Sequence, residues 1–393
     1  MIYRRFGRTN LQMPVFSCGG MRYQYKWQDV PMGEVPEEHQ RNLENTIRRA
    51  VELGINHIET ARGYGSSERQ LGQILPTFRR EDLIVQTKVG CNEDGDQFLK
   101  DFEDSLARLR LNHVDLLAIH GINNHELLEQ STRPGGCLAA CRKIQKRGLA
   151  RHIGFSTHGP TDVIVDAVKT GEFDYVNLHW FYLFQKNWPA IEEATKRDMG
   201  VFIISPSDKG GMLYDPPARL TELCRPLHPL VFNDLFCLSH PQVHTLSIGA
   251  ARPTDFDLHM ETLPLMERAG ELLPPIIQRL QETMRSSVAA DLLDPFSMGL
   301  PEWDRTPGQV NLPVILWLLN LANAYDMVKY GQMRYNLLGS GGHWFPGQNA
   351  EKMDDQAITE ALGGTAFAKK VPALAREAHE KLAKDPVKRL SQS

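Results

Sequence analysis

The chain has 393 residues and a formal net charge of −4, enough for a large α/β domain with an appendage. This charge and a pI of about 6.4 argue against binding to nucleic acid or anionic membranes through bulk positive charge. The six cysteines form no CxxC pair, which indicates free thiols in a reducing compartment. No apolar run has the length of a signal peptide or of the roughly 20 residues that span a bilayer. We therefore expect a cytoplasmic protein without nucleic-acid or membrane partners.

Short apolar, β-branched segments alternate with amphipathic segments along the first two thirds of the chain. The expected strands are Val15–Met21, Ile55–Ala61, Leu83–Gly90, Val114–His120, His152–Thr157, Tyr175–Trp180, Val201–Pro206 and Val243–Ala250. The expected helices between them include Gln40–Leu53, Gln97–Leu109, Leu138–Arg147, Asp162–Lys169 and Ala190–Arg197. Strand–helix repetition implies a parallel sheet with right-handed crossovers. Eight units in about 250 residues fit a (β/α)8 TIM barrel better than an open sheet.

Both ends of the chain depart from this repeat. The segment Tyr3 to Met13 holds a turn-like GRTN, which predicts a short hairpin that plugs the bottom of the barrel. After about residue 261 the pattern is helical, with helices expected at Leu272–Met284 and Val310–Tyr330. The apolar run ILWLLNLA indicates that this part packs on the barrel or on a partner. We therefore expect a barrel domain at residues 1–265 and a helical C-terminal extension at residues 266–393.

Four polar residues stand at or just after the ends of three consecutive expected strands: Glu59, Tyr64, Lys88 and His120. The carboxyl ends of barrel strands meet at one mouth, so these side chains should lie together. A tyrosine with its usual pKa of about 10 is a weak acid, and a nearby ammonium lowers that pKa. Glu59 can anchor Lys88, while His120 orients a carbonyl oxygen that Tyr64 protonates as a hydride reaches the carbon.

Each of these residues alone also has a structural explanation. Lys88 can pair with a carboxylate, His120 can be a hydrogen-bonded strand residue, and Tyr64 can anchor a loop between two glycines. Their joint occurrence in three successive strand regions favours a shared catalytic site.

The segments IETARGYGSSE, QTKVG and DLLAIHG resemble, in this order, the catalytic segments of the aldo-keto reductase family. RRFGRTNLQMPVFSCGGM is similar to the opening of that family, and the resemblance extends over roughly residues 1–265. It implies an NADPH-dependent reductase of small carbonyl compounds that uses no metal. The C-terminal helices resemble the extension of a bacterial subgroup, many of whose members carry a cysteine-rich cluster. No cysteine follows Cys237, so we expect no iron–sulfur cluster.

The resemblance also implies contacts with the nicotinamide end of the cofactor. Met21 and Arg22 match positions that contact nicotinamide and ribose. Ser156 and Asn177 match positions that hold the carboxamide. For Ser156, a helix N-cap is an alternative explanation.

Contacts with the phosphates are implied in the same way. Ser205, Lys209 and Gly210, in SPSDKGG, match a loop around the pyrophosphate, where a lysine and backbone amides suit the charge. A plain turn is the alternative explanation of this loop. Gly249 and Ala250 match the region of the adenosine phosphate.

Several positions depart from the family pattern. Arg252 can pair with a 2′-phosphate, but Asp255 stands where many members have an arginine, so NAD(H) is also possible. Ile204 stands where many members stack a tyrosine on the nicotinamide. Glu59 replaces an aspartate, and its extra methylene moves the carboxylate by roughly 1.5 Å.

Two further functions are compatible with these residues. One is a cofactor-binding module that senses redox state with little turnover, and the other is a barrel lyase or isomerase without a cofactor. Aromatic residues at Tyr23–Trp27 and Trp180–Phe184 suit either a flat substrate or ordinary packing.

Overall fold

The computed structural model describes residues 1–340 and 345–384. The chain forms two compact units. The barrel unit comprises Met1–Gly210 and Asn233–Ala269, and the helical unit comprises Gly211–Phe232 and Gly270–Ser393. Residues 211–232 thus group with the helical unit although they fall within the expected barrel domain. The division into folding domains at residues 265 and 266 stays a prediction.

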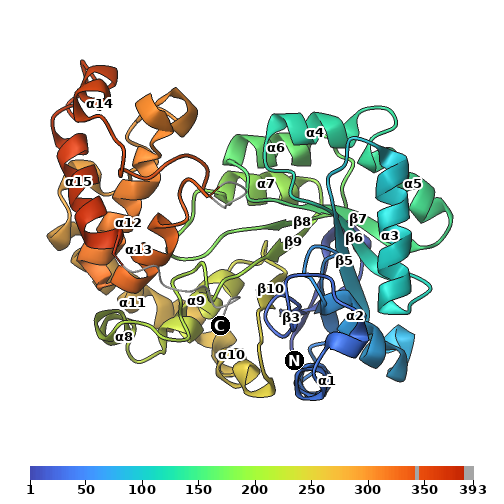
Figure 1. The fold of residues 1–393 in the computed structure, drawn as a ribbon. Coiled ribbons are helices and arrows are strands. Elements are labelled where there is room, and N and C mark those ends of the chain that lie inside the picture. The colour runs from blue at the N-terminus through green and yellow to red at the C-terminus, as the bar shows by residue number, and fades with distance from the viewer. Residues whose placement is uncertain (341–344, 385–393) are drawn as a thin grey trace. The chain divides into compact units, whose positions relative to one another are not determined.

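Eight parallel strands close into a barrel in the order β10-β3-β4-β5-β6-β7-β8-β9 (Figure 1). They are β3 (Phe16–Gly19), β4 (His57–Glu59), β5 (Ile84–Gly90), β6 (Val114–His120), β7 (Ala150–Ser156), β8 (Tyr175–Leu178), β9 (Gly200–Ile203) and β10 (Thr245–Ile248). Each overlaps one of the expected strands. The last strand pairs with the first, with Leu246 opposite Phe16, which confirms the predicted (β/α)8 barrel.

Helices follow most of these strands. Five of these helices overlap the helical segments expected from the sequence. The helices of the barrel unit are α1 (Glu37–Glu52), α2 (Ser67–Ile74), α3 (Gly95–Leu109), α4 (His125–Thr132), α5 (Cys137–Lys146), α6 (Thr161–Lys169), α7 (Trp188–Lys196) and α10 (Asp257–Met260). A further helix, α9 (Pro229–Leu238), spans the sequence boundary at Asn233. Helix α1 illustrates the pattern, because Leu43, Ile47 and Ala50 form its buried stripe.

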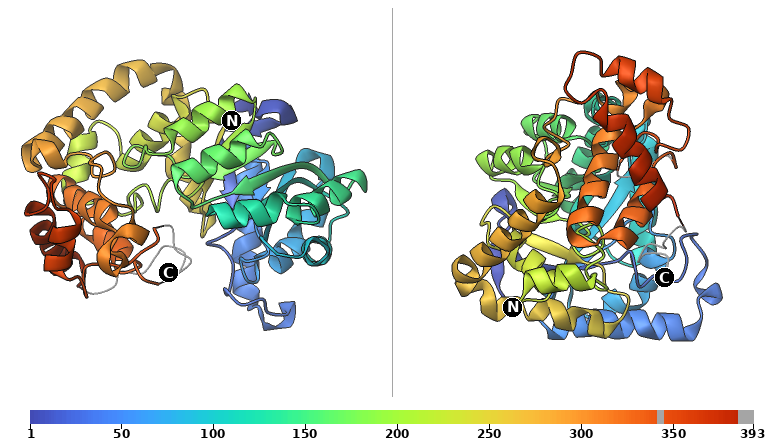
Figure 2. Two further views of the ribbon diagram at one scale, coloured as in Figure 1. Left: turned by 90° about the horizontal axis from the view of Figure 1, so that it is seen from above. Right: turned by 90° about the vertical axis from the view of Figure 1, so that its left-hand side faces the viewer.

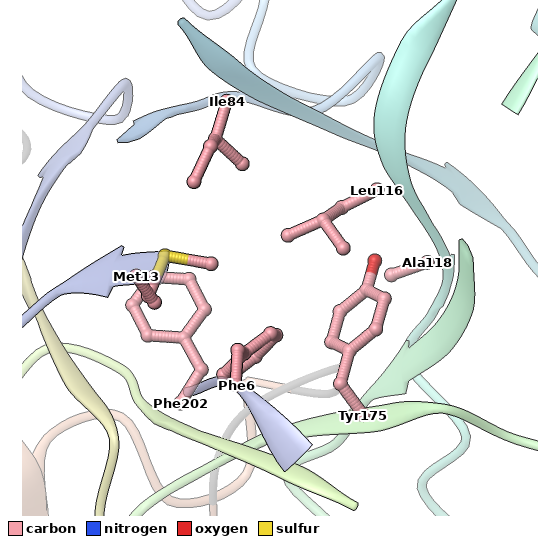
Figure 3. Packing of buried hydrophobic residues seen from close by; sticks show 7 residues of the cluster. All are labelled: Phe6, Met13, Ile84, Leu116, Ala118, Tyr175 and Phe202. Carbon is pink, nitrogen blue, oxygen red and sulfur yellow. The ribbon is translucent and has the colours of Figure 1, made fainter. Parts of the chain in front are cut away.

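The N-terminal hairpin closes one end of the barrel, as predicted. It consists of β1 (Tyr3–Arg5) and β2 (Gln12–Pro14), paired antiparallel. Its connection brings Phe6 into a buried cluster inside the barrel (Figure 3). The cluster comprises Phe6, Met13, Ile84, Leu116, Ala118, Tyr175 and Phe202. Because Ile84 and Tyr175 begin their strands, the hairpin lies at the amino end and leaves the carboxyl ends to polar residues.

The helical unit contains α8 (Ala218–Cys224), α11 (Ala269–Ser287), α12 (Leu312–Tyr325), α13 (Val328–Tyr335), α14 (Asp355–Ala361) and α15 (Lys370–Leu382). Figure 2 shows α12, α13 and α15 packed together, and α12 is buried almost all round. The helix expected over Val310–Tyr330 is in fact two helices. Asp326 adopts a left-handed conformation (φ 60°) that ends α12. None of the helices described is long and apolar enough to cross a membrane.

Candidate active site

Strand pairing gathers the four predicted catalytic residues at the carboxyl end of the barrel. Glu59 ends β4, Lys88 lies near the end of β5, and His120 ends β6, and these three strands are neighbours. Tyr64 lies in the turn after β4, where its backbone N–H donates to Ala61 O at 3.0 Å. The Glu59, Tyr64 and Lys88 side chains are buried.

Lys88 is the centre of this group. Its ammonium forms an ion pair with Glu59 Oε1, and it donates to Thr60 O at 2.8 Å and to Tyr64 OH at 3.3 Å. Three acceptors match the three N–H bonds of an ammonium group. Burial lowers the pKa of Lys88 well below its usual value, and the contact with Glu59 opposes that shift. The pair therefore fixes the position of the Lys88 amino group beside Tyr64.

Small neighbours leave room for the longer side chain of Glu59. Its Oε2 accepts from Ser247 Oγ on β10 at 3.4 Å. A Cβ at Gly19, on β3, would lie 3.2 Å from Glu59 Oε2 and 2.5 Å from Ser247 Oγ. Sequence reasoning missed both residues, although the Gly19–Gly20 pair near the end of the first expected strand was an available signal.

Tyr64 and His120 face each other in the same group. Their rings are nearly perpendicular, at 82°, with centroids 5.8 Å apart. We expected Lys88 to lower the pKa of Tyr64, and that direction is wrong. Burial raises the pKa of Tyr64 above its usual value, because a buried phenolate loses its hydration. The attraction of Lys88 does not make up for this loss. Tyr64 therefore keeps its proton at neutral pH.

His120 is neutral under the same conditions. Burial, and then the positive charge of Lys88, lowers the pKa of His120 to about 3. A neutral imidazole has one N–H donor and one acceptor nitrogen, so it can donate to a carbonyl oxygen without competing as an acid.

Two predicted carboxamide contacts lie on the next strands, β7 and β8. Ser156 Oγ accepts from Gly121 N at 3.2 Å. Helix α6 begins only at Thr161, so Ser156 is not its N-cap. Asn177 is fully buried, and neither its Oδ1 nor its Nδ2 has a hydrogen-bond partner within the described part of the chain. A buried polar group without a partner costs about 1–3 kcal/mol, so this amide suits a ligand with a complementary amide, such as a carboxamide.

The predicted pyrophosphate loop follows β9 and turns tightly. Ser205 has a left-handed backbone (φ 53°), and its carbonyl accepts from Lys209 N at 3.1 Å. A Cβ at Gly210 would lie 1.9 Å from Pro206 O, so only glycine fits this turn. The Lys209 ammonium lies 3.1 Å from His179 Nε2. The loop is thus held in one tight backbone turn, and the Lys209 side chain lies beside it.

Asp255 pairs with two arginines of the predicted cofactor site, Arg22 of the nicotinamide and ribose region and Arg252 of the adenosine phosphate region. Arg22 donates to Gly249 O at 2.5 Å and approaches Asp255 Oδ2 at 3.4 Å. Arg252 donates to Asp255 Oδ1 at 3.1 Å, and Ala251 N donates to Asp255 Oδ2 at 2.8 Å. An arginine already paired with a carboxylate is a weaker partner for a phosphate.

The remaining predicted positions are placed by the ends of two other strands. Met21 follows β3 and is half-buried, while Ala250 follows β10 and is buried. Of the aromatic residues, Trp180 is buried and stacks on Phe236 at 5.1 Å, which is ordinary packing. Trp27 is 43% exposed, and its ring meets the Tyr64 ring edge-on at 6.2 Å. Among residues 1–340 and 345–384, no group of three or more His, Cys, Asp or Glu residues is placed to hold a metal ion.

Comparisons with known proteins agree with this geometry. A model of the aldo/keto reductase family matches residues 16–214. L-galactose dehydrogenase from Arabidopsis thaliana is 34% identical over an alignment of 151 residues that covers 35% of this chain and 46% of that protein. L-glyceraldehyde 3-phosphate reductase from Escherichia coli is 28% identical over an alignment of 177 residues that covers 41% of this chain and 46% of that protein. The chain thus spans about half the length of these curated relatives.

Solved structures show the same fold. The holo form of an aldo-keto reductase from Bacillus halodurans superposes with a TM-score of 0.55 and 20% identity. This match covers 71% of the present chain and 96% of the other.

Proposed function

Because this chain belongs to the aldo/keto reductase family, we propose that it is an NAD(P)H-dependent oxidoreductase that reduces an aldehyde or ketone to the alcohol, or catalyses the reverse oxidation. The observation that carries the proposal is the contact of Tyr64 with Lys88, which is itself ion-paired with Glu59. A phenol, an ammonium and a neutral imidazole at one barrel mouth suit the protonation of a carbonyl oxygen.

In this mechanism His120 and Tyr64 act on the substrate oxygen. His120 donates a hydrogen bond to the oxygen and orients the carbonyl group. Tyr64 keeps its proton until negative charge develops on that oxygen, and then donates it as a general acid. Lys88 stabilises the phenolate that remains, and Glu59 holds Lys88 in place. When bound, the reduced nicotinamide supplies the hydride.

The residues around the barrel mouth fit a nicotinamide cofactor. The amide of Asn177, which has no hydrogen-bond partner among the described residues, and the hydroxyl of Ser156 would hold the carboxamide beside Tyr64. Met21 and Arg22 would border the nicotinamide and ribose, and the loop containing Ser205, Lys209 and Gly210 would bind the pyrophosphate. The residues that would border the adenosine phosphate are Gly249, Ala250 and Arg252.

The charge of Asp255 supports NADH as well as NADPH. Its carboxylate binds both Arg22 and Arg252, and a 2′-phosphate would have to displace it. A carboxylate can instead accept from a free ribose 2′-hydroxyl, as dinucleotide-binding sites often do.

A Tyr64→Phe variant tests the proposal. We expect kcat for reduction of a generic aromatic aldehyde to fall by about 10²–10⁴-fold, the usual contribution of general acid catalysis. Cofactor binding, followed by quenching of protein fluorescence, should persist. Tyr175→Phe is a matched control, because Tyr175 OH is buried at the other end of the barrel without a hydrogen-bond partner among the described residues.

The possible outcomes separate the competing functions. Unchanged turnover in Tyr64→Phe would remove Tyr64 from the reaction. Tight cofactor binding without turnover of any aldehyde or ketone by the native chain would favour a redox-sensing module. Absence of cofactor binding would argue against both the reductase and the redox-sensing module.

A further inference from the structure

A second set of polar residues lies in the barrel unit outside the proposed hydride-transfer group. His259 Nδ1 lies 2.5 Å from Asp234 Oδ2, and His259 Nε2 lies 3.5 Å from Ser207 Oγ. All three residues are buried, with 4% of Ser207 exposed. They come from the loop after β9, from α9 and from α10. A carboxylate, an imidazole and a hydroxyl are thus aligned in that order, which is the arrangement of a serine nucleophile with its base.

The hydrogen-bonding groups define a direction for the proton. An ionised carboxylate only accepts, so Nδ1 of His259 carries the hydrogen that Asp234 receives. Nε2 therefore presents its lone pair to Ser207, and the Ser207 hydroxyl is the donor. The ring of Phe16 packs against the imidazole, with centroids 5.6 Å apart at 66°. His259 is thus held as the tautomer that can remove a proton from Ser207.

Asp234 contacts His259 through its Oδ2. Asp234 Oδ1 is buried without a hydrogen-bond partner in the part of the chain that the structure describes. Burial raises the pKa of Asp234, and the contact with His259 opposes the rise. Burying a carboxylate oxygen without a hydrogen bond costs free energy. A positive charge on His259 would lower this cost by Coulomb attraction to Asp234.

The serine is held against this pair by its own loop. Asn233, next to Asp234 on α9, donates to Pro206 O at 3.3 Å, next to Ser207. Ser205 contributes the left-handed turn. Asn233 thus holds the loop directly at Pro206, whereas Asp234 reaches Ser207 only through His259. Left-handed backbone at a residue other than glycine, as at Ser205, is often found at functional sites.

We propose that Ser207, His259 and Asp234 form an acyl-transfer site, with Ser207 as the nucleophile toward small activated esters. Ser207 Oγ bonds to the acyl carbon while its proton passes to His259 Nε2. His259 then gives this proton to the leaving alkoxide as the ester C–O bond breaks. Water next attacks the acyl carbon and loses a proton to His259, and the bond to Oγ breaks as Oγ regains a proton. The low exposure of Ser207 limits the acyl group to a few atoms.

This site is separate from the hydride-transfer residues. It follows β9, and β10 and β3 stand between β9 and β4 in the barrel order. The acyl-transfer reaction requires no nicotinamide cofactor, so its failure and the failure of carbonyl reduction are independent results.

A fluorophosphonate probe and p-nitrophenyl acetate test the proposal on the full chain. We expect one covalent adduct per chain, located at Ser207 by peptide mass spectrometry, and none in Ser207→Ala. His259→Gln should slow labelling at least about a hundredfold, because serine–histidine sites lose about 10³-fold or more without the base.

Ser239→Ala is the matched control. Ser239 Oγ also lies near a histidine nitrogen, His240 Nδ1, at 3.3 Å. That nitrogen lies 2.8 Å from Phe236 O, a carbonyl that only accepts, so it carries a hydrogen and cannot take the proton of Ser239. Labelling should therefore survive Ser239→Ala.

A cysteine variant gives a measurement that does not depend on the rate of acylation. In Ser207→Cys, His259 should hold the new thiol partly as thiolate, so alkylation by iodoacetamide should fall by less than about threefold between about pH 8 and about pH 6. A free thiol, with a pKa of about 8.5, would lose roughly a hundredfold over this range. Any of three results would overturn the proposal. They are the absence of an adduct at Ser207 in a protein with native melting behaviour, labelling that His259→Gln does not change, and alkylation of Ser207→Cys with the pH dependence of a free thiol.

Discussion

Replacing Glu59 by glutamine keeps the shape of the side chain and removes its charge. In the structure the Glu59 carboxylate contacts Lys88, and the two side chains are 4% and 1% exposed. Removing one partner of a buried ion pair costs about 3–5 kcal/mol. Loss of the Lys88 proton can relieve this penalty, and at about 1.4 kcal/mol per unit it corresponds to a further fall of about 2–4 units in the pKa of Lys88.

The sign of the pH dependence follows from the direction of that shift. Burial already places the pKa of Lys88 in the folded protein below its value of about 10.4 in the unfolded chain. Between those two values the unfolded chain binds more protons, so stability rises with pH. Glu59→Gln widens the pH interval between these two pKa values, because it lowers the pKa of Lys88 in the folded protein further. Its loss of stability relative to the native chain should therefore be largest at neutral pH and should shrink as the pH approaches about 10.

Thermal unfolding followed by circular dichroism from about pH 6 to about pH 9 measures this effect. Glu59→Asp is the control, because it keeps the charge and shortens the side chain by about one bond, or 1.5 Å. We expect it to keep the native pH dependence and to retain carbonyl reductase activity within about tenfold. Equal melting temperatures of Glu59→Gln and the native chain at neutral pH would refute the buried ion pair as the support of Lys88.

Three further changes probe the cofactor region and the loop around Tyr64. Asn177→Leu removes two buried polar atoms that have no hydrogen-bond partner in the described part of the chain. The protein without cofactor should therefore melt at a higher temperature, while cofactor binding weakens at least about tenfold; a lower melting temperature with unchanged binding would contradict this. Asp255→Asn should shift the ratio of the kcat/KM values for NADPH and NADH toward NADPH by about tenfold or more. Asp257→Asn, at an exposed position, should leave this ratio unchanged. An unchanged ratio in Asp255→Asn would exclude Asp255 from cofactor choice. Gly65→Ala should lower the melting temperature, because its Cβ would lie 1.9 Å from Lys26 O at a φ of 52°. The same change at Gly63 meets no atom of the described residues within 4 Å and should have little effect, so equal melting of the two variants would argue against this packing.

The sequence was sufficient to predict the barrel because its signals are local. Each strand is a short apolar run followed by an amphipathic segment, and parallel pairing then brings the strand ends together. The gathering of Lys88 and Tyr64 followed from that rule. The break at Asp326 was not predictable, because the helical pattern continues through it without a glycine or proline.

The parts of the site that were missed depend on tertiary contacts. Ser247 meets Glu59 across 188 positions of sequence, and His259 meets Asp234 from a different helix. The direction of the Tyr64 pKa was also wrong, because the sequence shows a neighbouring lysine but not the burial that outweighs it.

The N-terminal hairpin has a consequence for the order in which the chain folds. Arg4 donates to Leu238 O at 2.6 Å, and Arg5 pairs with Asp198 at 2.5 Å, so these two residues bind residues that are synthesised about two hundred positions later. Barrel closure likewise requires β10, the last barrel strand in the sequence, to pair with β3, the first barrel strand. During synthesis Phe6 therefore remains without two of its buried neighbours, Tyr175 and Phe202, until β8 and β9 have been made. Contacts of such long sequence separation slow folding and leave apolar segments exposed in the meantime.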